Sequence, residues 1–293
     1  INLKYEKDED PAYIFRDISK GIKEKLKKLK VNKNEILGIG ISIVGIVDQE
    51  NGISVNAQGL WKKKVEVAQV FKENFDIPVH VANNIHSYFL AYKLFENMQT
   101  DNGNYIFLKY GTGIGSALIM NNEIQDGIHF SAGKLSHIRV ESPAIVKCPC
   151  GDINCLDAVV NFYRIINEVK EVYSEEVTPV LYEKTNGIEE NINIEHIFYA
   201  YSQGEVMIKE ILERKYYAIA SVLVDIVKFI DPDRVFITGY GFTNETLNRL
   251  FFDYVYELSN RKISREIFVK NDIYKIPQYI GAVALILEKE FYN

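Results

Sequence analysis

The stretch HIRVESPAIVKCPCGDINC, residues 137–155, contains all three cysteines of the chain. They are spaced C-x-C-x4-C, at Cys148, Cys150 and Cys155. Three thiolates and one imidazole complete a tetrahedral zinc shell, and His137 is the nearest candidate for the fourth ligand. A site with four protein ligands leaves no open coordination position, so the sequence predicts a structural zinc that stabilises the loop.

Two other interpretations of the cysteines stay open. The three thiols could be unrelated buried side chains, although chance rarely places all the cysteines of a chain in one loop. A redox pair is the weaker option, because the usual redox motif has two residues between its cysteines. Pro149 and Gly151 lie among the cysteines and supply the sharp turn that a chelating loop needs.

Length and composition indicate a globular chain without a membrane span. A chain of 293 residues suggests two lobes, and no apolar run reaches the roughly 18 residues that cross a bilayer. The net charge of −6 disfavours a protein built mainly to coat nucleic acid. An odd cysteine count without a signal peptide is typical of the reducing cytoplasm. Because the first residue is Ile, we expect a fragment or a processed chain.

The apolar pattern predicts strands that alternate with helices, so the fold class is α/β. A first helix begins after Asp10, with Pro11 in its first turn, and its lysines between 23 and 30 are interpreted as a solvated face. Strands are predicted within 36–48 (broken at Gly45) and 77–83, a hairpin within 104–120, and a turn, a strand and a glycine loop within 231–242. Helices are predicted over 84–95, 156–169, 195–202, 205–229 and 281–291, with another starting near residue 243.

Two glycine loops follow predicted strands. GTGIG (Gly111–Gly115) lacks the Gly-Lys-Ser/Thr of a P-loop. Its backbone N–H groups can still bind phosphate oxygens, but a plain hairpin turn explains the sequence about equally well. ITGYGF (Ile237–Phe242) has a similar arrangement of strand, glycines and helix start.

Together these motifs resemble the ROK family, named for repressors, open reading frames and sugar kinases. The likeness begins at ILGIGISIVGIVDQENGI and continues through VNAQGLW, VHVANNIHSYFLAY, GTGIGSALI, IDPDRVFITGYG and the final GAVALI. Its most specific part is the block SAGKLSH…CPCGDINCLD. The chain is most similar to the kinase-like, effector-binding body of a family regulator of the xylose- or N-acetylglucosamine-repressor type.

The resemblance implies an actin-like or hexokinase-like fold, with two ribonuclease H-like α/β lobes, a zinc loop and ligand in the cleft. We expect residues 1–100 to form the N-terminal lobe, without the family's opening strands. Residues 101–293 would form the C-terminal lobe, with the zinc loop 137–155 and a helical dimerisation region. A DNA-reading helix-turn-helix would precede Ile1, and a homodimer or homotetramer is expected.

The resemblance also identifies the positions that carry kinase chemistry. Active kinases have an Asn-Asp pair whose Asp takes the proton from the attacking hydroxyl, and here the pair is Asn83 and Asn84. An amide has no usable basic lone pair, so Asn84 cannot act as that general base. Two glutamates that hold sugar hydroxyls are replaced by Lys134 and Asp157. Tyr240 interrupts the usual glycine run of the nucleotide loop.

These positions give the candidate site residues. The ligand-binding candidates are Asn83, Asn84, Lys134, His137 and Asp157. The remnants of the nucleotide-phosphate loops are Gly111, Thr112, Gly113, Gly239 and Gly241. Asn83 and Asn84 precede a helix and could be simple N-caps, and His86 is interpreted as a surface or packing residue. Trp61 either belongs to a loop that closes over substrate or only packs. Lys134 favours an acidic or phosphorylated effector.

Three functions remain possible. The first is a transcriptional repressor that senses a carbohydrate or phosphorylated carbohydrate and has no catalytic residues. The second is an active sugar kinase, of the glucokinase or N-acetylhexosamine kinase type, which would use ATP and magnesium and a different base. The third is a degenerate scaffold that acts only through protein contacts. The replaced general base favours the first.

Overall fold

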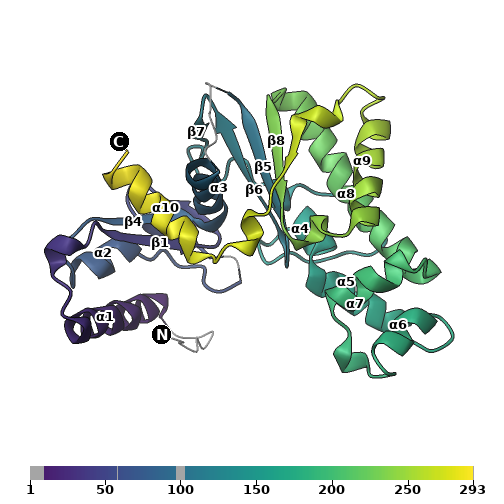
Figure 1. Cartoon of the computed structure of the whole chain (residues 1–293), viewed down its shortest axis with the longest axis horizontal. Coiled ribbons are helices and arrows are strands. Elements are labelled where there is room, and N and C mark those ends of the chain that lie inside the picture. The colour runs from purple at the N-terminus through teal and green to yellow at the C-terminus, as the bar shows by residue number, and fades with distance from the viewer. Residues whose placement is uncertain (1–9, 58, 97–102, 293) are drawn as a thin grey trace. The chain divides into compact units, whose positions relative to one another are not determined.

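The computed structural model describes residues 10–57, 59–96 and 103–292. The chain divides into two compact units. Unit 1 contains the described residues between 10 and 96, the segment Asp126–Ala132 and residues 275–292. Unit 2 contains residues 103–125 and Gly133–Tyr274. Each unit combines helices with strands (Figure 1), which confirms the predicted α/β class. No helix among the described residues is long and apolar enough to cross a bilayer.

Unit 1 is built from short strands and flanking helices. Its helices are α1 (Pro11–Leu29), α2 (Val67–Lys72), α3 (Asn84–Phe95) and α10 (Tyr279–Glu290), with a 3₁₀ turn η1 (Lys33–Glu35). Its strands are β1 (Ile39–Ile43), β2 (Ile46–Asp48), β3 (Ile53–Asn56) and β4 (Val79–Asn83). β1 and β4 pair in parallel, and β2 and β3 pair antiparallel. The predicted break at Gly45 is confirmed, since its φ of 95° separates β1 from β2.

The predicted start of α1 is also confirmed. The side chain of Asp10 accepts a hydrogen bond from the Ala12 N–H at 3.3 Å, and Pro11 is the first helical residue. Phe15 is buried on the side that packs against α2. The lysines between residues 23 and 30 are exposed, as expected for a solvated helix face.

The last helix, α10, packs within unit 1. A Cβ built on Gly40 of β1 would lie 2.0 Å from the carbonyl oxygen of Ala282, so only glycine allows this close approach. The sequence-based division assigned residues 275–293 to the second lobe. The structure groups 275–292 with unit 1, because α10 lies against α3 and β1.

Unit 2 is built around one five-stranded sheet. In the order in which they pair, its strands are β7 (Glu123–Ile124), β6 (Ile114–Met120), β5 (Tyr105–Tyr110), β8 (Arg234–Thr238) and β9 (Phe268–Lys270). β5, β8 and β9 are parallel, and β6 and β7 return antiparallel. Its α-helices are α4 (Leu156–Val160), α5 (Phe162–Val172), α6 (Pro179–Lys184), α7 (Ile194–Ser202), α8 (Val206–Ile230) and α9 (Glu245–Leu258). Its 3₁₀ turns include η2 (Leu135–His137) and η4 (Tyr240–Phe242).

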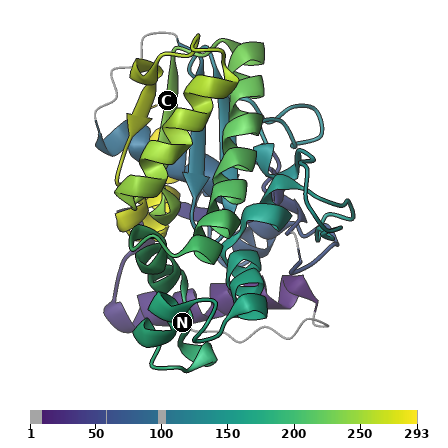
Figure 2. The same ribbon diagram turned by 90° about the vertical axis from the view of Figure 1, so that its right-hand side faces the viewer.

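One face of this sheet is covered by helices. Figures 1 and 2 both show α8 and α9 along the same side of β5 and β8. Ile106 and Leu108 of β5 and Val235 and Ile237 of β8 belong to one buried core with the apolar side of α8. Because side chains alternate along a strand, the intervening positions of β5, Tyr105, Phe107 and Lys109, point to the opposite face.

The predicted helix over 156–169 is wrong in one respect, because it is broken at Asn161. This residue is extended (φ −63°, ψ 153°) and caps the next helix by accepting a hydrogen bond from the Arg164 N–H at 2.7 Å. The N–H of Phe162 donates instead to the carbonyl of Thr112 in the glycine loop, at 3.0 Å. This tertiary hydrogen bond is invisible in the helical periodicity.

Candidate metal centre and ligand site

The cysteine loop folds as a small hairpin held by its own backbone. Asn154 and Val146 are joined twice, since the Asn154 N–H donates to the Val146 carbonyl at 2.7 Å and the Val146 N–H donates to Asn154 Oδ1 at 2.8 Å. The Cys148 N–H donates to the carbonyl of Asp152 at 2.8 Å. Gly151 at the tip has a φ of 110°, where L-residues are strained.

Two further hydrogen bonds attach this hairpin beside η2. The Leu156 N–H donates to the Ile138 carbonyl at 2.8 Å, and the Val140 N–H donates to the Asn154 carbonyl at 2.9 Å. The segment after His137 therefore runs alongside the segment that carries Cys155. This pairing explains how a histidine 18 positions before the last cysteine reaches it.

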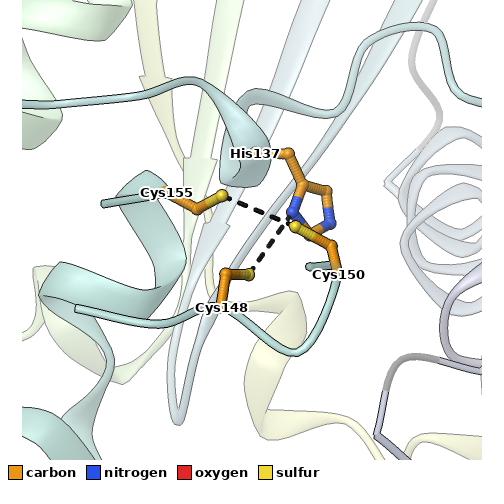
Figure 3. A group of neighbouring side chains, drawn as sticks. All are labelled: His137, Cys148, Cys150 and Cys155. Carbon is orange, nitrogen blue, oxygen red and sulfur yellow. Dashed lines mark hydrogen bonds between the residues drawn. The ribbon is translucent and has the colours of Figure 1, made fainter. Parts of the chain in front are cut away.

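Figure 3 shows the side chains of His137, Cys148, Cys150 and Cys155 pointing toward one another. Their four candidate ligand atoms all lie within 4.8 Å of one another. Cys150 Sγ is 3.6 Å from Cys155 Sγ, and Cys148 Sγ is 3.8 Å from His137 Nδ1. A tetrahedron with metal–sulfur bonds of 2.3 Å has edges of about 3.8 Å. The set therefore has the size of a zinc shell and could hold a metal ion.

The pKa shifts of three of the four candidate ligands are also consistent with a metal site. Burial, followed by hydrogen bonds and charge repulsion among the thiols, raises the pKa of Cys155 to about 12. Burial also raises the pKa of Cys148 and lowers the pKa of His137, which keeps the imidazole neutral. Without a cation, burial therefore favours the protonated thiols of Cys148 and Cys155, and a bound dication would supply the charge that their thiolates need.

Asp157 is tied to the first glycine loop. Its Oδ1 accepts a hydrogen bond from the Ile114 N–H at 2.8 Å, and a Cβ built on Gly113 would lie 2.5 Å from the same oxygen. Burial raises the pKa of Asp157, although the Ile114 N–H and the nearby His137 oppose the shift. One carboxylate oxygen of this predicted ligand residue thus has a scaffolding role, and Gly113 is required for the close approach.

Packing alone explains the glycines of the second loop. A Cβ on Gly239 would lie 2.1 Å from the carbonyl oxygen of Tyr110, and one on Gly241 would lie 2.1 Å from the Tyr110 ring. Tyr110 is fully buried and donates to the carbonyl of Val160 at 2.6 Å. The ring of Tyr240 stacks on Phe198 with a centroid distance of 5.8 Å. These glycines are therefore no evidence for a nucleotide by themselves.

Asn83 and Asn84 lie in unit 1, at the junction of β4 and α3. Asn83 is buried, and its Oδ1 accepts hydrogen bonds from the N–H groups of Ile85 (2.9 Å) and His86 (3.4 Å). Its Nδ2 donates a hydrogen bond to the Gly45 carbonyl at 2.7 Å. Asn83 is therefore an N-cap, as one sequence interpretation proposed. Asn84 is the first residue of α3.

The remaining ligand candidates lie in unit 2. Lys134 directly precedes η2, which ends at His137, and its charge contributes to the lowered pKa of that histidine. Asp157 lies in the first turn of α4, two positions after Cys155. The metal cluster, the first glycine loop and these three candidates therefore gather in one part of unit 2, while Asn83 and Asn84 belong to unit 1.

Unit 1 contains a polar cluster that was not predicted from the sequence. His86 is 3% exposed, and its Nδ1 lies 3.1 Å from Asp126 Oδ1. Gln49 donates from Nε2 to Asp126 Oδ2 at 2.6 Å. The signal was a histidine in the first turn of α3, but nothing in the sequence paired it with residues 49 and 126. Trp61 packs edge-on against Phe15 and donates to Ser54, which supports its packing interpretation.

The two α/β units and the Cys3His cluster define the fold of actin-like, hexokinase-like sugar kinases and their regulatory relatives. A family model described as the ROK family matches residues 3–289, nearly the whole chain. The chain belongs to the ROK family, which confirms the resemblance seen in the sequence.

Individual relatives include both repressors and kinases. A xylose repressor of Caldicellulosiruptor bescii is 24% identical over 288 residues, covering 95% of this chain and 69% of the repressor. A glucokinase of Halalkalibacterium halodurans is 21% identical over 236 residues, covering 80% of this chain and 70% of the kinase. Among solved structures, a ROK family transcriptional regulator, homologue of an E. coli protein called MLC, superposes with a TM-score of 0.73 at 19% identity. The superposition covers 94% of this chain and 68% of the regulator.

Proposed function

We propose that this chain is the carbohydrate-sensing body of a ROK transcriptional repressor and does not transfer phosphate. One observation carries the proposal: the residue at the family's proton-accepting position, the first residue of α3, is Asn84. General-base catalysis contributes typically 10²–10⁴-fold to rate, and an amide cannot provide it. Lys134 and Asp157 depart from the kinase pattern as well.

The effector of this sensor is a carbohydrate or a phosphorylated carbohydrate. Its candidate contacts are Asn84, Lys134, His137 and Asp157, with Asn83 fixing the start of α3. Binding shifts the population between two conformations of the body only if the effector binds one of them more tightly. DNA contact would come from a helix-turn-helix preceding Ile1.

A structural zinc on His137, Cys148, Cys150 and Cys155 is part of the proposal. When bound, zinc supplies a fixed charge that keeps the thiolates together and orients the imidazole. The hairpin, η2 and the start of α4 would then form one rigid element. Lys134 and Asp157, which flank this element, would keep constant positions relative to the effector.

A sugar kinase is the alternative function, and the match to a glucokinase over 80% of this chain favours keeping it. The discriminating experiment is a coupled ATP-turnover assay with magnesium and a panel of hexoses. We expect no hexose-dependent turnover for the wild type, and a gain in the Asn84→Asp variant only if the rest of the site is intact. Turnover at ordinary kinase rates that disappears in Asn84→Ala would overturn the regulator proposal.

We also propose that α8 is the dimerisation region, because its exposed side is complementary to itself. A groove of about 1410 Å³ lies between α8 and residues 138–143, and Arg214, Tyr217 and Asp225 line its helical wall. If two copies of α8 pack antiparallel with their two-fold axis level with Ile219 and Ala220, midway between residues 214 and 225, each Arg214 meets the partner's Asp225. Neither side chain forms an ion pair within the described part of the chain.

Charge exchange tests this dimer. By light scattering we expect a dimer for the wild type, a monomer for Arg214→Asp, and a restored dimer for the double variant with Asp225→Arg. A wild-type monomer, or a dimer insensitive to both changes, would contradict the α8 interface.

A further inference from the structure

One surface of unit 1 carries a charge opposite to that of the whole chain. Residues 16–30 contain seven basic and two acidic side chains, although the net charge of the chain is −6. They belong to α1 and its C-cap, and Figure 1 shows this helix (purple) at the margin of unit 1. A local positive charge on an acidic protein attracts anionic partners to that surface alone.

The basic side chains of α1 align on one face of the helix. Lys20, Lys23 and Lys27 are separated by three and four positions, so they lie on adjacent turns, and all three are exposed. Lys30, the C-cap, continues the spacing and is exposed as well. None of these four lysines, which we call the basic face of α1, forms an ion pair within the described residues.

Helix stability does not explain the basic face. The helix macrodipole favours cations in the last turn, where Lys27 and Lys28 lie, but Lys20 and Lys23 lie in the middle of α1. Like charges three or four positions apart also repel each other and destabilise a helix. The basic face therefore costs stability, and an anionic partner would offset that cost.

The opposite side of α1 decides which kind of partner fits. Phe15 is buried there, and Ile18 and Ile22 pack against the same core of unit 1. An amphipathic helix binds a membrane by inserting its apolar side, and this side of α1 is already occupied. Lysine is also depleted in protein–protein interfaces. A surface of exposed lysines therefore fits a polyanion better than it fits a membrane or a protein.

A second basic run lies close to α1. Lys62, Lys63 and Lys64 are exposed and form no ion pair in the part of the chain that the structure describes. They directly follow Trp61, whose ring packs against Phe15 of α1 with a centroid distance of 5.7 Å. Both groups of lysines thus belong to one part of unit 1.

We propose that the basic face of α1 contacts the phosphate backbone of duplex DNA. The inference rests on the proposed function, in which the DNA-reading segment precedes Ile1 and α1 is the first described helix after it. A rise of 1.5 Å per residue places Lys20 and Lys27 about 10 Å apart along the helix, and one DNA strand presents about three phosphates over that axial length. Phosphate contacts carry no sequence information, so the basic face adds affinity without reading the operator.

The experiment measures, by fluorescence anisotropy, the binding of the purified chain to a labelled duplex of about 20 base pairs and random sequence at several salt concentrations. Four phosphate contacts predict a slope of log K against log salt of about −3.6, with little dependence on the DNA sequence. No binding at about 50 mM salt would overturn the proposal. Vesicles of phosphatidylserine and phosphatidylcholine are the second probe, and binding to them but not to the duplex would also overturn it.

A triple variant locates the effect on α1. Lys20→Gln, Lys23→Gln and Lys27→Gln together should weaken DNA binding at about 50 mM salt at least tenfold and make the salt slope shallower by about 3. DNA binding that keeps the wild-type affinity and slope in this variant would contradict the proposal.

The matched control removes the same charge from unit 2. Lys209, Lys262 and Lys270 are exposed, and their triple change to Gln should leave the affinity for DNA and the salt slope close to those of the wild type. Equal losses in the two triple variants would mean that DNA binding follows net charge alone, and the basic face would then have no special role.

Glu24 provides a test in the opposite direction. It is exposed and lies four positions from both Lys20 and Lys28 on α1. Glu24→Gln removes a charge that repels phosphate, so we expect DNA binding to become about twofold tighter or more. This variant also decides the question if the triple lysine variant does not fold, because unchanged or weaker binding in Glu24→Gln would contradict the proposal.

The failures of the two proposals can be told apart. If a sugar raises the Tm of the chain but the chain does not bind DNA, the sensor proposal stands and the inference on α1 is wrong. If the chain binds DNA through the basic face and also phosphorylates a hexose at ordinary kinase rates, the regulator proposal fails and the DNA contact stands.

Discussion

Removal of the proposed zinc is the perturbation for which the structure gives the clearest expectation. The four ligand atoms already lie within 4.8 Å of one another, and the hairpin that carries three of them is closed by backbone hydrogen bonds. Little chain entropy is therefore lost when zinc binds, so most of the binding free energy stabilises the folded state. We expect the purified chain to contain about one zinc per chain and to lose stability in a strong chelator.

The size of the effect follows from mass action. A ligand present at about 1,000 times its Kd stabilises the folded state by about 4 kcal/mol. For a domain the size of unit 2, each kcal/mol changes Tm by about 2–4 °C, so chelation should lower Tm by about 8–16 °C. Differential scanning calorimetry with metal analysis of the same sample measures both quantities.

Cys155→Ser provides the matched control. This buried residue is one of the four ligands, so its variant should start at the lower Tm and show little further change on chelation. The reasoning would be refuted by zinc well below one per chain together with a Tm that the chelator leaves unchanged. The cluster would then be a set of protonated thiols.

Three further predictions concern stability. Asn83→Ala should destabilise the chain by about 1–2 kcal/mol in a denaturant titration, and Asn83→Ser, which keeps a capping oxygen, by less; no change would mean that Asn83 does not cap α3. Gly113→Ala should cost about 1–3 kcal/mol, because its methyl group would lie 2.5 Å from Asp157 Oδ1, and Asp157→Ala should relieve most of that cost in a double-mutant cycle. Burial raises the pKa of Glu205 above 4.5, despite opposing hydrogen bonds from backbone N–H groups, so the folded state keeps this proton to higher pH than the unfolded state. The stability that Glu205 contributes is then lost as pH rises through that pKa. We therefore subtract the unfolding free energy of Glu205→Gln from that of the wild type, and we expect this difference to be larger at about pH 4 than at about pH 8.

Local patterns predicted the elements well where the chain decides its own structure. The cap at Asp10, the break at Gly45 and the start of α3 at Asn84 were all visible, because capping and glycine conformation depend on neighbouring residues. The clustering of His137 with the cysteines was predicted from ligand chemistry, which limits the number of partners that a zinc shell accepts.

Contacts between distant segments could not be predicted. The break at Asn161 depends on a hydrogen bond between Phe162 and Thr112, and the membership of α10 in unit 1 depends on its packing against α3. His86 was interpreted as a surface or packing residue, and its contact with Asp126, 40 positions away, was not predicted. The position of Lys109 beside Gly111 likewise follows from the side chain's path, which the sequence does not specify.

Under the proposed function, the departures from the kinase pattern are compatible with a sensor, because catalysis and sensing require different interactions. A kinase must bind its transition state more tightly than its substrate, and an amide at position 84 would not supply the general-base part of that difference. A sensor needs only a ligand that distinguishes two conformations, and a shift from 1:99 to 99:1 requires about 5.5 kcal/mol of difference. Hydrogen bonds to charged groups contribute about 1.5–3 kcal/mol each. Two such contacts to one ligand would therefore supply most of this difference if only one conformation allows both. If Lys134 contacts a phosphorylated effector, as proposed, we expect Lys134→Glu to weaken the preference for glucose 6-phosphate over glucose without creating kinase activity, and a preference that is unchanged in titration calorimetry would contradict that role.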